Sequence, residues 1–357
     1  MGAAGDLLGQ HASVHHAVEL GRRGALSRIS LNIAIVAICG WLTMGSASGQ
    51  VRPCPFAATP QEAFVCSDPD LARLRQQLEA RFLEASAALS HRGQAQLEGN
   101  QNAWRKFVTI VCARTETSNE KQCLARAYSD QLKVLGQAAQ RLGPFVFTIV
   151  QRLQVQKNYD TSPTPIGPDD QPLGLRVINF SYPQIDNAES PEAKAWNIAI
   201  AQQGGNIGSD CEAGQSYQSY EIRSATSQAI SVVFSTWQYC QGAAHGMYGG
   251  TSSNLYLDVP PRPIALDAFF IPGTPWRQFL TDWATHYLKT HVNGTGQPYS
   301  AESIAAIAPA WGDSWSMTAT GLDILHEAGP YALGEQDIET PWADLKPFLC
   351  PDAPLPR

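Results

Sequence analysis

Apolar residues in the first third of the chain recur at steps of three and four residues. This spacing places side chains on one face of a helix. The successive series are Leu71, Leu74, Leu78, Phe82, Ala85 and Leu89; Leu97, Trp104, Val108 and Val111; and Leu124, Tyr128, Leu132 and Leu135. Ser67-Asp68-Pro69 ahead of the first series is a helix start signal, a capping side chain followed by proline. The pattern predicts a small antiparallel bundle of three helices.

After Gly143-Pro144 the pattern changes to β-branched and aromatic runs separated by turns, which is typical of strands. The predicted strands are 145–155, 175–182, 217–223, 229–239, 255–259, 315–320 and 322–326. The predicted helices are 190–203, 274–288 and 300–308. The chain is therefore predicted to be α+β: a small disulfide-linked helical bundle, residues 50–142, followed by an antiparallel-sheet domain packed by helices, residues 143–357.

The N-terminus has the order of an export signal. Arg22, Arg23 and Arg28 precede an apolar run at 31–42, and small residues follow at 45–49. The run is shorter than the roughly 20 apolar residues that a membrane span needs. We therefore expect residues 1–49 to be a cleaved signal peptide and the protein to be periplasmic or secreted. The alternative is an uncleaved anchor, which would be the chain's only contact with the membrane.

Cysteine usage fits an exported chain, in which disulfides form and persist. After residue 49 the cysteines are Cys54, Cys66, Cys112, Cys123, Cys211, Cys240 and Cys350. Two pairs are close in sequence, Cys54–Cys66 and Cys112–Cys123. A hairpin turning at residues 224–226 would place Cys211 opposite Cys240 and leave Cys350 spare. The alternative pairing is Cys240–Cys350, with Cys211 free.

The first segment carries a recognisable set of residues. They are Cys54, Pro60, Glu62, Cys66, Leu71, Gln101, Trp104, Cys112, Cys123, Leu124, Tyr128 and Leu132. This set resembles the lysozyme-inhibitor LprI N-terminal family (DUF1311), with Val108 where an arginine is usual. The resemblance implies a helical extracytoplasmic domain associated with lysozyme inhibition in at least some relatives. It marks Glu62, Gln101, Trp104 and Tyr128 as family-motif positions.

The second segment carries another set. Its runs are Trp196-Asn197-Ile198, Gly242-Ala243-Ala244-His245-Gly246, Leu255-Tyr256-Leu257-Asp258, Ile264 to Phe270, and Leu325 to Gly334. Over about 145–348 these resemble the C-terminal lysozyme-sensing domain of the RsiV anti-sigma factor, the DUF3298 family. The resemblance implies an α+β recognition domain. Its family-motif positions are His245, Gly246, Pro330, Tyr331 and Gly334.

Catalytic chemistry has one weak candidate, His245 with Asp258, which could act as a general base. The competing interpretation is a histidine bonded to backbone in a tight turn, and we favour it. We expect no catalytic site, no cofactor and no metal.

Charge separates the two segments. Residues 50–142 hold 12 Lys and Arg against 9 Asp and Glu, net +3, and residues 143–357 hold 10 against 21, net −11. An acidic domain attracts cationic partners and is a poor nucleic-acid binder. We therefore predict a non-catalytic envelope binding protein that recognises or inhibits lysozyme-type muramidases. The alternatives are an envelope polysaccharide-binding or polysaccharide-modifying protein, or a structural envelope module with a protein partner. The oligomeric state is left unassigned.

Overall fold

The structure is a computed structural model that describes residues 59–112, 117–157, 175–204, 214–240, 242–293, 296–309, 311–326 and 336–356. These ranges all belong to one compact unit, Val51–Arg357. The predicted signal peptide, 1–49, lies outside the described residues. The fold is α+β, as predicted from the sequence pattern.

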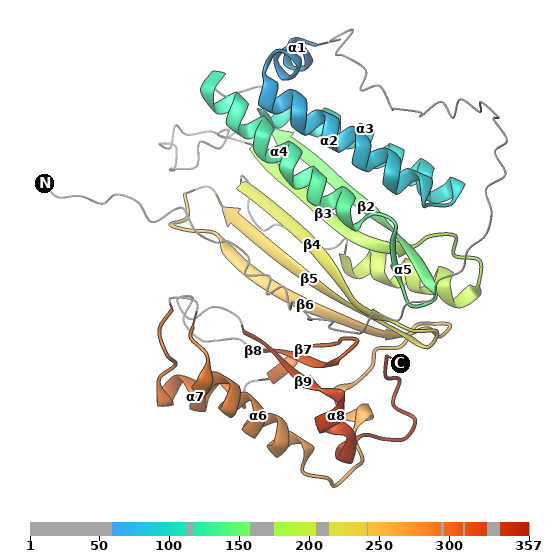
Figure 1. Cartoon of the computed structure of the whole chain (residues 1–357), viewed down its shortest axis with the longest axis vertical. Coiled ribbons are helices and arrows are strands. Elements are labelled where there is room, and N and C mark those ends of the chain that lie inside the picture. The colour runs from blue at the N-terminus through green and yellow to red at the C-terminus, as the bar shows by residue number, and fades with distance from the viewer. Residues whose placement is uncertain are drawn as a thin grey trace, which may run out of the picture. The chain divides into compact units, whose positions relative to one another are not determined.

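The first part of the unit is helical (Figure 1). Its helices are α1 (Pro60–Ser67), α2 (Pro69–Ala87), α3 (His91–Cys112) and α4 (Thr117–Gln137). Helices α2, α3 and α4 are the three predicted ones. The Asp68 carboxylate caps α2, because it accepts hydrogen bonds from the backbone N–H groups of Asp70 and Leu71 at 3.0 and 3.1 Å. The residues that α2 buries, Leu71, Leu78 and Ala85, belong to its predicted apolar face.

A six-stranded sheet follows, with its strands side by side in chain order. They are β1 (Gln140–Leu142), β2 (Phe145–Lys157), β3 (Leu175–Ile185), β4 (Gly214–Ala225), β5 (Ala229–Cys240) and β6 (Met247–Tyr256). One detail of the prediction is wrong, because the sheet is mixed: β3 and β4 pair in parallel. Helix α5 (Pro191–Gly204) lies between these two strands in the chain. A strand–helix–strand crossover returns the chain in its original direction, which makes the flanking strands parallel.

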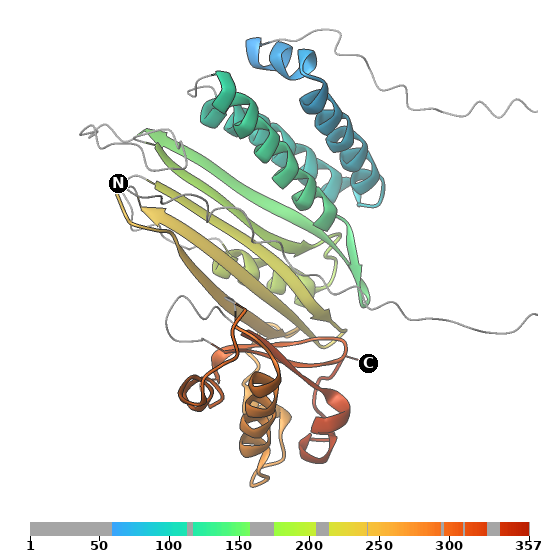
Figure 2. The same ribbon diagram turned by 60° about the vertical axis from the view of Figure 1, so that its left-hand side comes forward.

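A second, antiparallel sheet completes the unit (Figure 2). Its strands are β7 (Trp311–Met317), β8 (Gly321–His326) and β9 (Gln336–Pro341). The helices and 3-10 turns around it are η1 (Leu266–Phe269), α6 (Trp276–Thr290), α7 (Ala301–Ile307), α8 (Trp342–Leu345) and η3 (Lys346–Phe348). Strand β7 packs against β6, whereas α3 packs against β2 at the other side of the six-stranded sheet. The large sheet therefore lies between the helices and the second sheet.

The helices and the large sheet share one hydrophobic core. It includes Leu97 and Trp104 of α3, Phe147 of β2, Trp196 of α5 and Phe234 of β5. Polar groups join the same elements, since the Asn100 amide donates to the Ile149 carbonyl at 2.7 Å and accepts from the Gln151 N–H at 3.3 Å. These backbone groups lie beyond the short pairing of β2 with β1. Asn100 thus satisfies a stretch of sheet edge that would otherwise need another strand.

Two predicted details of register differ from the structure. Gly214, rather than Cys211, lies opposite Cys240, because the β4–β5 hairpin turns at residues 226–228, later than predicted. The bulge between Ile222 and Ser224 offsets only one residue of this difference. Strand β6 begins at Met247, eight residues before the predicted start at Leu255. Its first eight residues, Met247 to Asn254, are rich in glycine, serine and threonine, so they lack the apolar alternation that marks a strand.

Candidate functional site

Four predicted motif residues converge on one groove among the helices. The groove has a volume of about 590 Å³ and is lined by Glu62 of α1, Gln101 and Trp104 of α3, and Tyr128 of α4. Helix α2 supplies further lining residues. Residues separated by up to 66 positions therefore form one concave site because α1, α2, α3 and α4 pack together.

The floor of the groove is aromatic and apolar. The rings of Trp104 and Tyr128 meet edge to face, with centroids 5.1 Å apart, and Trp104 is only 5% exposed. Val108 also lines the floor and is buried, so it is part of the core. Leu83 lies at the rim and is 67% exposed, which is unusual for a large apolar side chain beside a concave site.

Charges of both signs surround this floor. The Arg75 Nε atom lies 3.0 Å from the Glu79 carboxylate, and its Nη1 donates to Cys66 Sγ at 3.1 Å. Arg105 and Glu62 are exposed and also line the groove. The groove therefore presents two guanidinium groups and two carboxylates around an aromatic floor.

The surroundings of Tyr128 change the pKa of its hydroxyl group. Burial raises the pKa of Tyr128, whereas the nearby charges of Arg75 and Arg105 oppose the rise. The hydroxyl is therefore protonated at neutral pH and can donate a hydrogen bond to a ligand in the groove.

Gln101 connects the groove to the sheet. It is 3% exposed, and its Oε1 accepts a hydrogen bond from Gln131 Nε2 at 3.2 Å. Gln131 and Gln151 of β2 exchange two further hydrogen bonds, at 3.0 and 3.1 Å. One wall of the groove is therefore fixed against the six-stranded sheet, which pre-organises the site for binding.

The motif residues of the second segment lie elsewhere. His245 is in an exposed turn before β6, and its Nδ1 lies 3.0 Å from the Gly246 carbonyl oxygen. Asp258 follows the far end of β6 and bonds to Arg262 at 2.6 Å. A strand of this length spans roughly 30 Å, so the structure does not bring His245 and Asp258 together. Pro330, Tyr331 and Gly334 lie outside the described residues.

Gly246 has a clear structural role. A Cβ atom at this position would lie 2.6 Å from the indole nitrogen of Trp237, closer than carbon and nitrogen can approach. The glycine therefore lets the start of β6 pass directly over the Trp237 ring.

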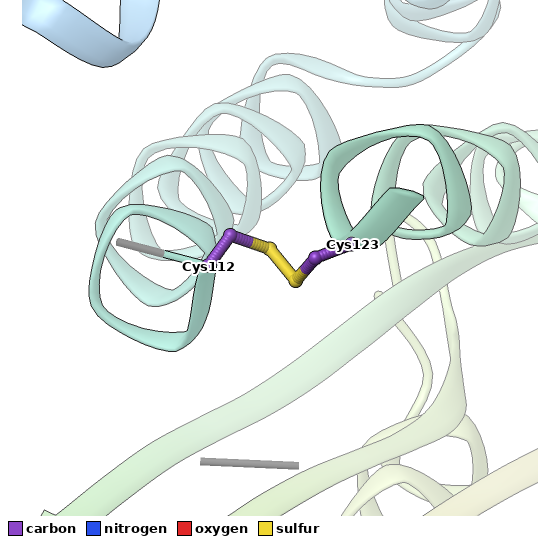
Figure 3. The surroundings of a disulfide bond; sticks show 2 residues. All are labelled: Cys112 and Cys123. Carbon is purple, nitrogen blue, oxygen red and sulfur yellow. A yellow bond between two sulfur atoms is a disulfide. The ribbon is translucent and has the colours of Figure 1, made fainter. Parts of the chain in front are cut away.

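Figure 3 shows the disulfide between Cys112 and Cys123, one of the three predicted pairs. It links the last residue of α3 to the first turns of α4. Cys66 and Cys240 are also disulfide-bonded. Their predicted partners, Cys54 and Cys211, lie outside the described residues. Cys350 is a free thiol and is half-buried.

Sequence reasoning missed the charged residues of the groove, above all Arg75, Glu79 and Arg105. A signal for two of them exists, because Arg75 and Glu79 lie on α2 one helical turn apart and beside the apolar residues Leu71 and Leu78. No feature of the sequence around Arg105 indicates that Arg105 lines the groove and that its exposed neighbour Lys106 does not.

Every helix among the described residues is too short or too polar to cross a membrane. Within the same ranges, no three His, Cys, Asp or Glu side chains gather in a way that could hold a metal ion.

No family model matches the chain, and none of the curated proteins matches it. Among solved structures, the chain is similar to a DUF3298 family protein from Pseudomonas aeruginosa, with 12% identity, a TM-score of 0.42, and coverage of 60% of this chain and 96% of that one. It is also similar to a DUF3298 family member from Bacteroides fragilis, with 17% identity, a TM-score of 0.39, and coverage of 59% of this chain and 96% of that one. Both solved proteins are described as DUF3298 family members, and none of the three comparisons supports the resemblance of the first segment to DUF1311.

Proposed function

We propose that the protein is an exported binding protein of the cell envelope that recognises lysozyme-type muramidases through the helical groove. The observation that carries this proposal is the convergence of Glu62, Gln101, Trp104 and Tyr128 on one concave site. These are the positions at which the first segment resembles a lysozyme-inhibitor family.

The chemistry of the groove suits a protein partner. Interface hot spots combine aromatic side chains and arginine in a pocket that excludes water. Here Trp104 and Tyr128 form the floor, Arg75 and Arg105 supply planar hydrogen-bond donors, and Leu83 at the rim offers apolar surface for burial.

The net charge of the sheet region is a second, independent reason to expect a cationic partner. Residues 143–357 carry a net charge of −11, which attracts a positively charged protein at long range. Such attraction raises the association rate and weakens with added salt, whereas contacts inside the groove set the dissociation rate. The two regions thus have distinct roles, steering and contact.

The test is calorimetry of the purified chain, residues 50–357, against a cationic lysozyme. Leu83→Ser and Arg105→Ala change exposed side chains of the groove, and we expect each to weaken binding about tenfold. Two matched controls change exposed residues of the same kinds outside the groove lining, Ile110→Ser and Lys106→Ala, and should bind as the native chain does.

Two results would count against the proposal, and they differ in meaning. Unchanged affinity in both groove variants would show that the lysozyme contacts another surface. No binding of lysozyme by the native chain, together with sedimentation on peptidoglycan, would favour the polysaccharide-binding alternative.

A further inference from the structure

A second cavity, with a volume of about 480 Å³, lies at the outer edge of β6. Its walls come from β6 itself, from the segment Pro263 to Asp267, from Gln203 near the end of α5, from Arg277 on α6 and from Trp315 on β7. Cavities of this size hold small ligands in proteins. It shares no lining residue with the helical groove, although Leu255 and the run Ile264 to Asp267 belong to the stretches that resemble DUF3298 in sequence.

Chain geometry creates the cavity. The segment after β6 folds back and pairs with it at Leu255 and Pro263, and the Ile264 N–H donates to the Asn254 carbonyl at 2.9 Å. The chain then turns into η1, which begins at Leu266. The edge of β6 before this pairing, at Ser252 and Ser253, therefore faces the cavity.

The walls are held by buried hydrogen bonds between the two sheets. The Asn254 amide donates to the Trp315 carbonyl at 2.6 Å and accepts from the Ser231 hydroxyl. The Met317 N–H in turn donates to that hydroxyl at 3.1 Å. The Trp315 ring meets Phe269 edge to face, with centroids 5.4 Å apart. The cavity is therefore pre-formed and needs little ordering when a ligand binds.

One polar side chain that lines the cavity has no hydrogen-bond partner among the described residues. Ser253 is 6% exposed, and within the described part of the chain its Oγ is buried with no hydrogen-bond partner. Buried hydroxyl groups are nearly always paired, because leaving one unpaired costs free energy. A ligand hydroxyl in the cavity would satisfy this group.

The mouth of the cavity supplies further donors and acceptors. Arg277, Asp267 and Gln203 are all exposed there. The Arg277 guanidinium lies over the Trp276 ring, 4.4 Å from its centroid, which orients the planar donor group. Arginine pairs with carboxylates in a bidentate manner, whereas Asp267 and Gln203 can accept from hydroxyl groups. Ile264 and Leu266 add an apolar wall.

We propose that this cavity binds an acidic monosaccharide unit, a pyranose ring that bears a carboxylate. Arg277 pairs with the carboxylate, Ser253 and Asp267 bond to ring hydroxyls, and the C–H face of the sugar packs on the wall formed by Ile264 and Leu266. The assignment follows from the mixture of one cation, several hydroxyl-bonding groups and an apolar wall in a space for one ring. It does not depend on what the helical groove binds.

The experiment is calorimetry of the chain, residues 50–357, with D-glucuronic acid as the probe and D-glucose as the neutral comparison. We expect glucuronic acid to bind at least about tenfold more tightly than glucose. Arg277→Gln should weaken glucuronic acid binding about tenfold or more, and Ser253→Ala by about threefold, because each removes one buried or charge-assisted contact.

Controls separate binding from folding. Lys289→Gln removes an exposed cation from the same helix outside the cavity lining and should leave the affinity unchanged. Arg277→Lys keeps the charge and should recover part of the affinity that Arg277→Gln loses. The proposal is overturned if the native chain does not bind glucuronic acid, if glucose binds equally well, or if a folded Arg277→Gln variant keeps full affinity.

Discussion

The six-stranded sheet is joined to the helices on one side and to the second sheet on the other, and the chemistry of the two junctions differs. The helical junction uses neutral amides and one carboxylate, whereas the junction with the second sheet combines a hydroxyl–amide network with a cluster of ionised groups. The two sides of a single sheet can therefore differ in how strongly their contacts depend on pH.

At the helical junction several buried polar groups have fixed partners. Asn100 bonds to two backbone groups of β2, and Gln131 bonds to Gln151. Asp186 at the end of β3 accepts from both the N–H and the hydroxyl of Ser90 at 2.6 Å, just before α3 begins. Amides do not titrate in the physiological range, so the contacts of Asn100 and Gln131 should be insensitive to pH.

At the junction with the second sheet one guanidinium faces several carboxylates. Arg223 of β4 lies 3.3 Å from Glu221 and 3.3 Å from Asp337, and 3.8 Å from Asp323 of β8. Asp323 is 6% exposed, and within the described residues its Oδ1 has no hydrogen-bond partner. Negative charge is therefore in excess here, and protonation of one carboxylate relieves it.

The largest effect should come from the helical junction. Asn100→Ala leaves the Ile149 carbonyl and the Gln151 N–H without their partner in a buried place. We expect it to lower the free energy of unfolding by about 3 kcal/mol, measured by urea denaturation. Asn102→Ala, on an exposed turn of the same helix, should change it by less than about 0.5 kcal/mol. Equal stability of the two variants would show that the edge of β2 does not need Asn100.

A smaller effect is expected from the cross-link within the helices. Replacing both Cys112 and Cys123 by serine should cost about 2–3 kcal/mol, because the disulfide restricts the unfolded chain. The shared core predicts that the variant still unfolds in one transition, with helical and tryptophan signals changing together. Cys350→Ser, which removes a free thiol, is the control. A separate, earlier loss of helix would mean that the helical junction is weaker than its hydrogen bonds suggest.

Much of the fold follows from local pattern, and the failures have tertiary causes. Helices α2, α3 and α4 follow the three- and four-residue spacing because each packs one face on the core. Strand β9, Gln336–Pro341, was missed because it is short and has one buried apolar residue, Ile338. The parallel pairing of β3 and β4 depends on where α5 packs, which periodicity does not report.

The two sites were predictable to different degrees. The family resemblance pointed to Glu62, Gln101, Trp104 and Tyr128, but only the packing of α2 adds Arg75 and Leu83 beside them. Part of the lining of the cavity at β6, Ile264 to Asp267, falls in a run that resembles DUF3298 in sequence. The rest comes from α5, β6, α6 and β7, which are far apart in the chain, so the sequence did not reveal a cavity there.

The last prediction concerns the charged junction, where the effect is spread over about three pH units. Burial, together with Asp337, raises the pKa of Asp323 from 3.8 to about 7, although Arg223 opposes the rise. Between these two pH values the folded protein holds a proton that the unfolded chain has released. The free energy of unfolding should therefore fall as the pH rises from about 4 to about 7, and level off above that.

Asp323→Asn removes this titration, because asparagine stays neutral in both states. We expect the variant to lose the downward slope between about pH 4 and 7, and to be more stable than the native chain at about pH 8. Asp344→Asn, an exposed carboxylate on α8, should keep the native slope. Urea denaturation of all three chains across this pH range distinguishes the outcomes. An unchanged slope in Asp323→Asn would mean that the pH dependence arises elsewhere, and that the two junctions of the large sheet are more alike than their contacts indicate.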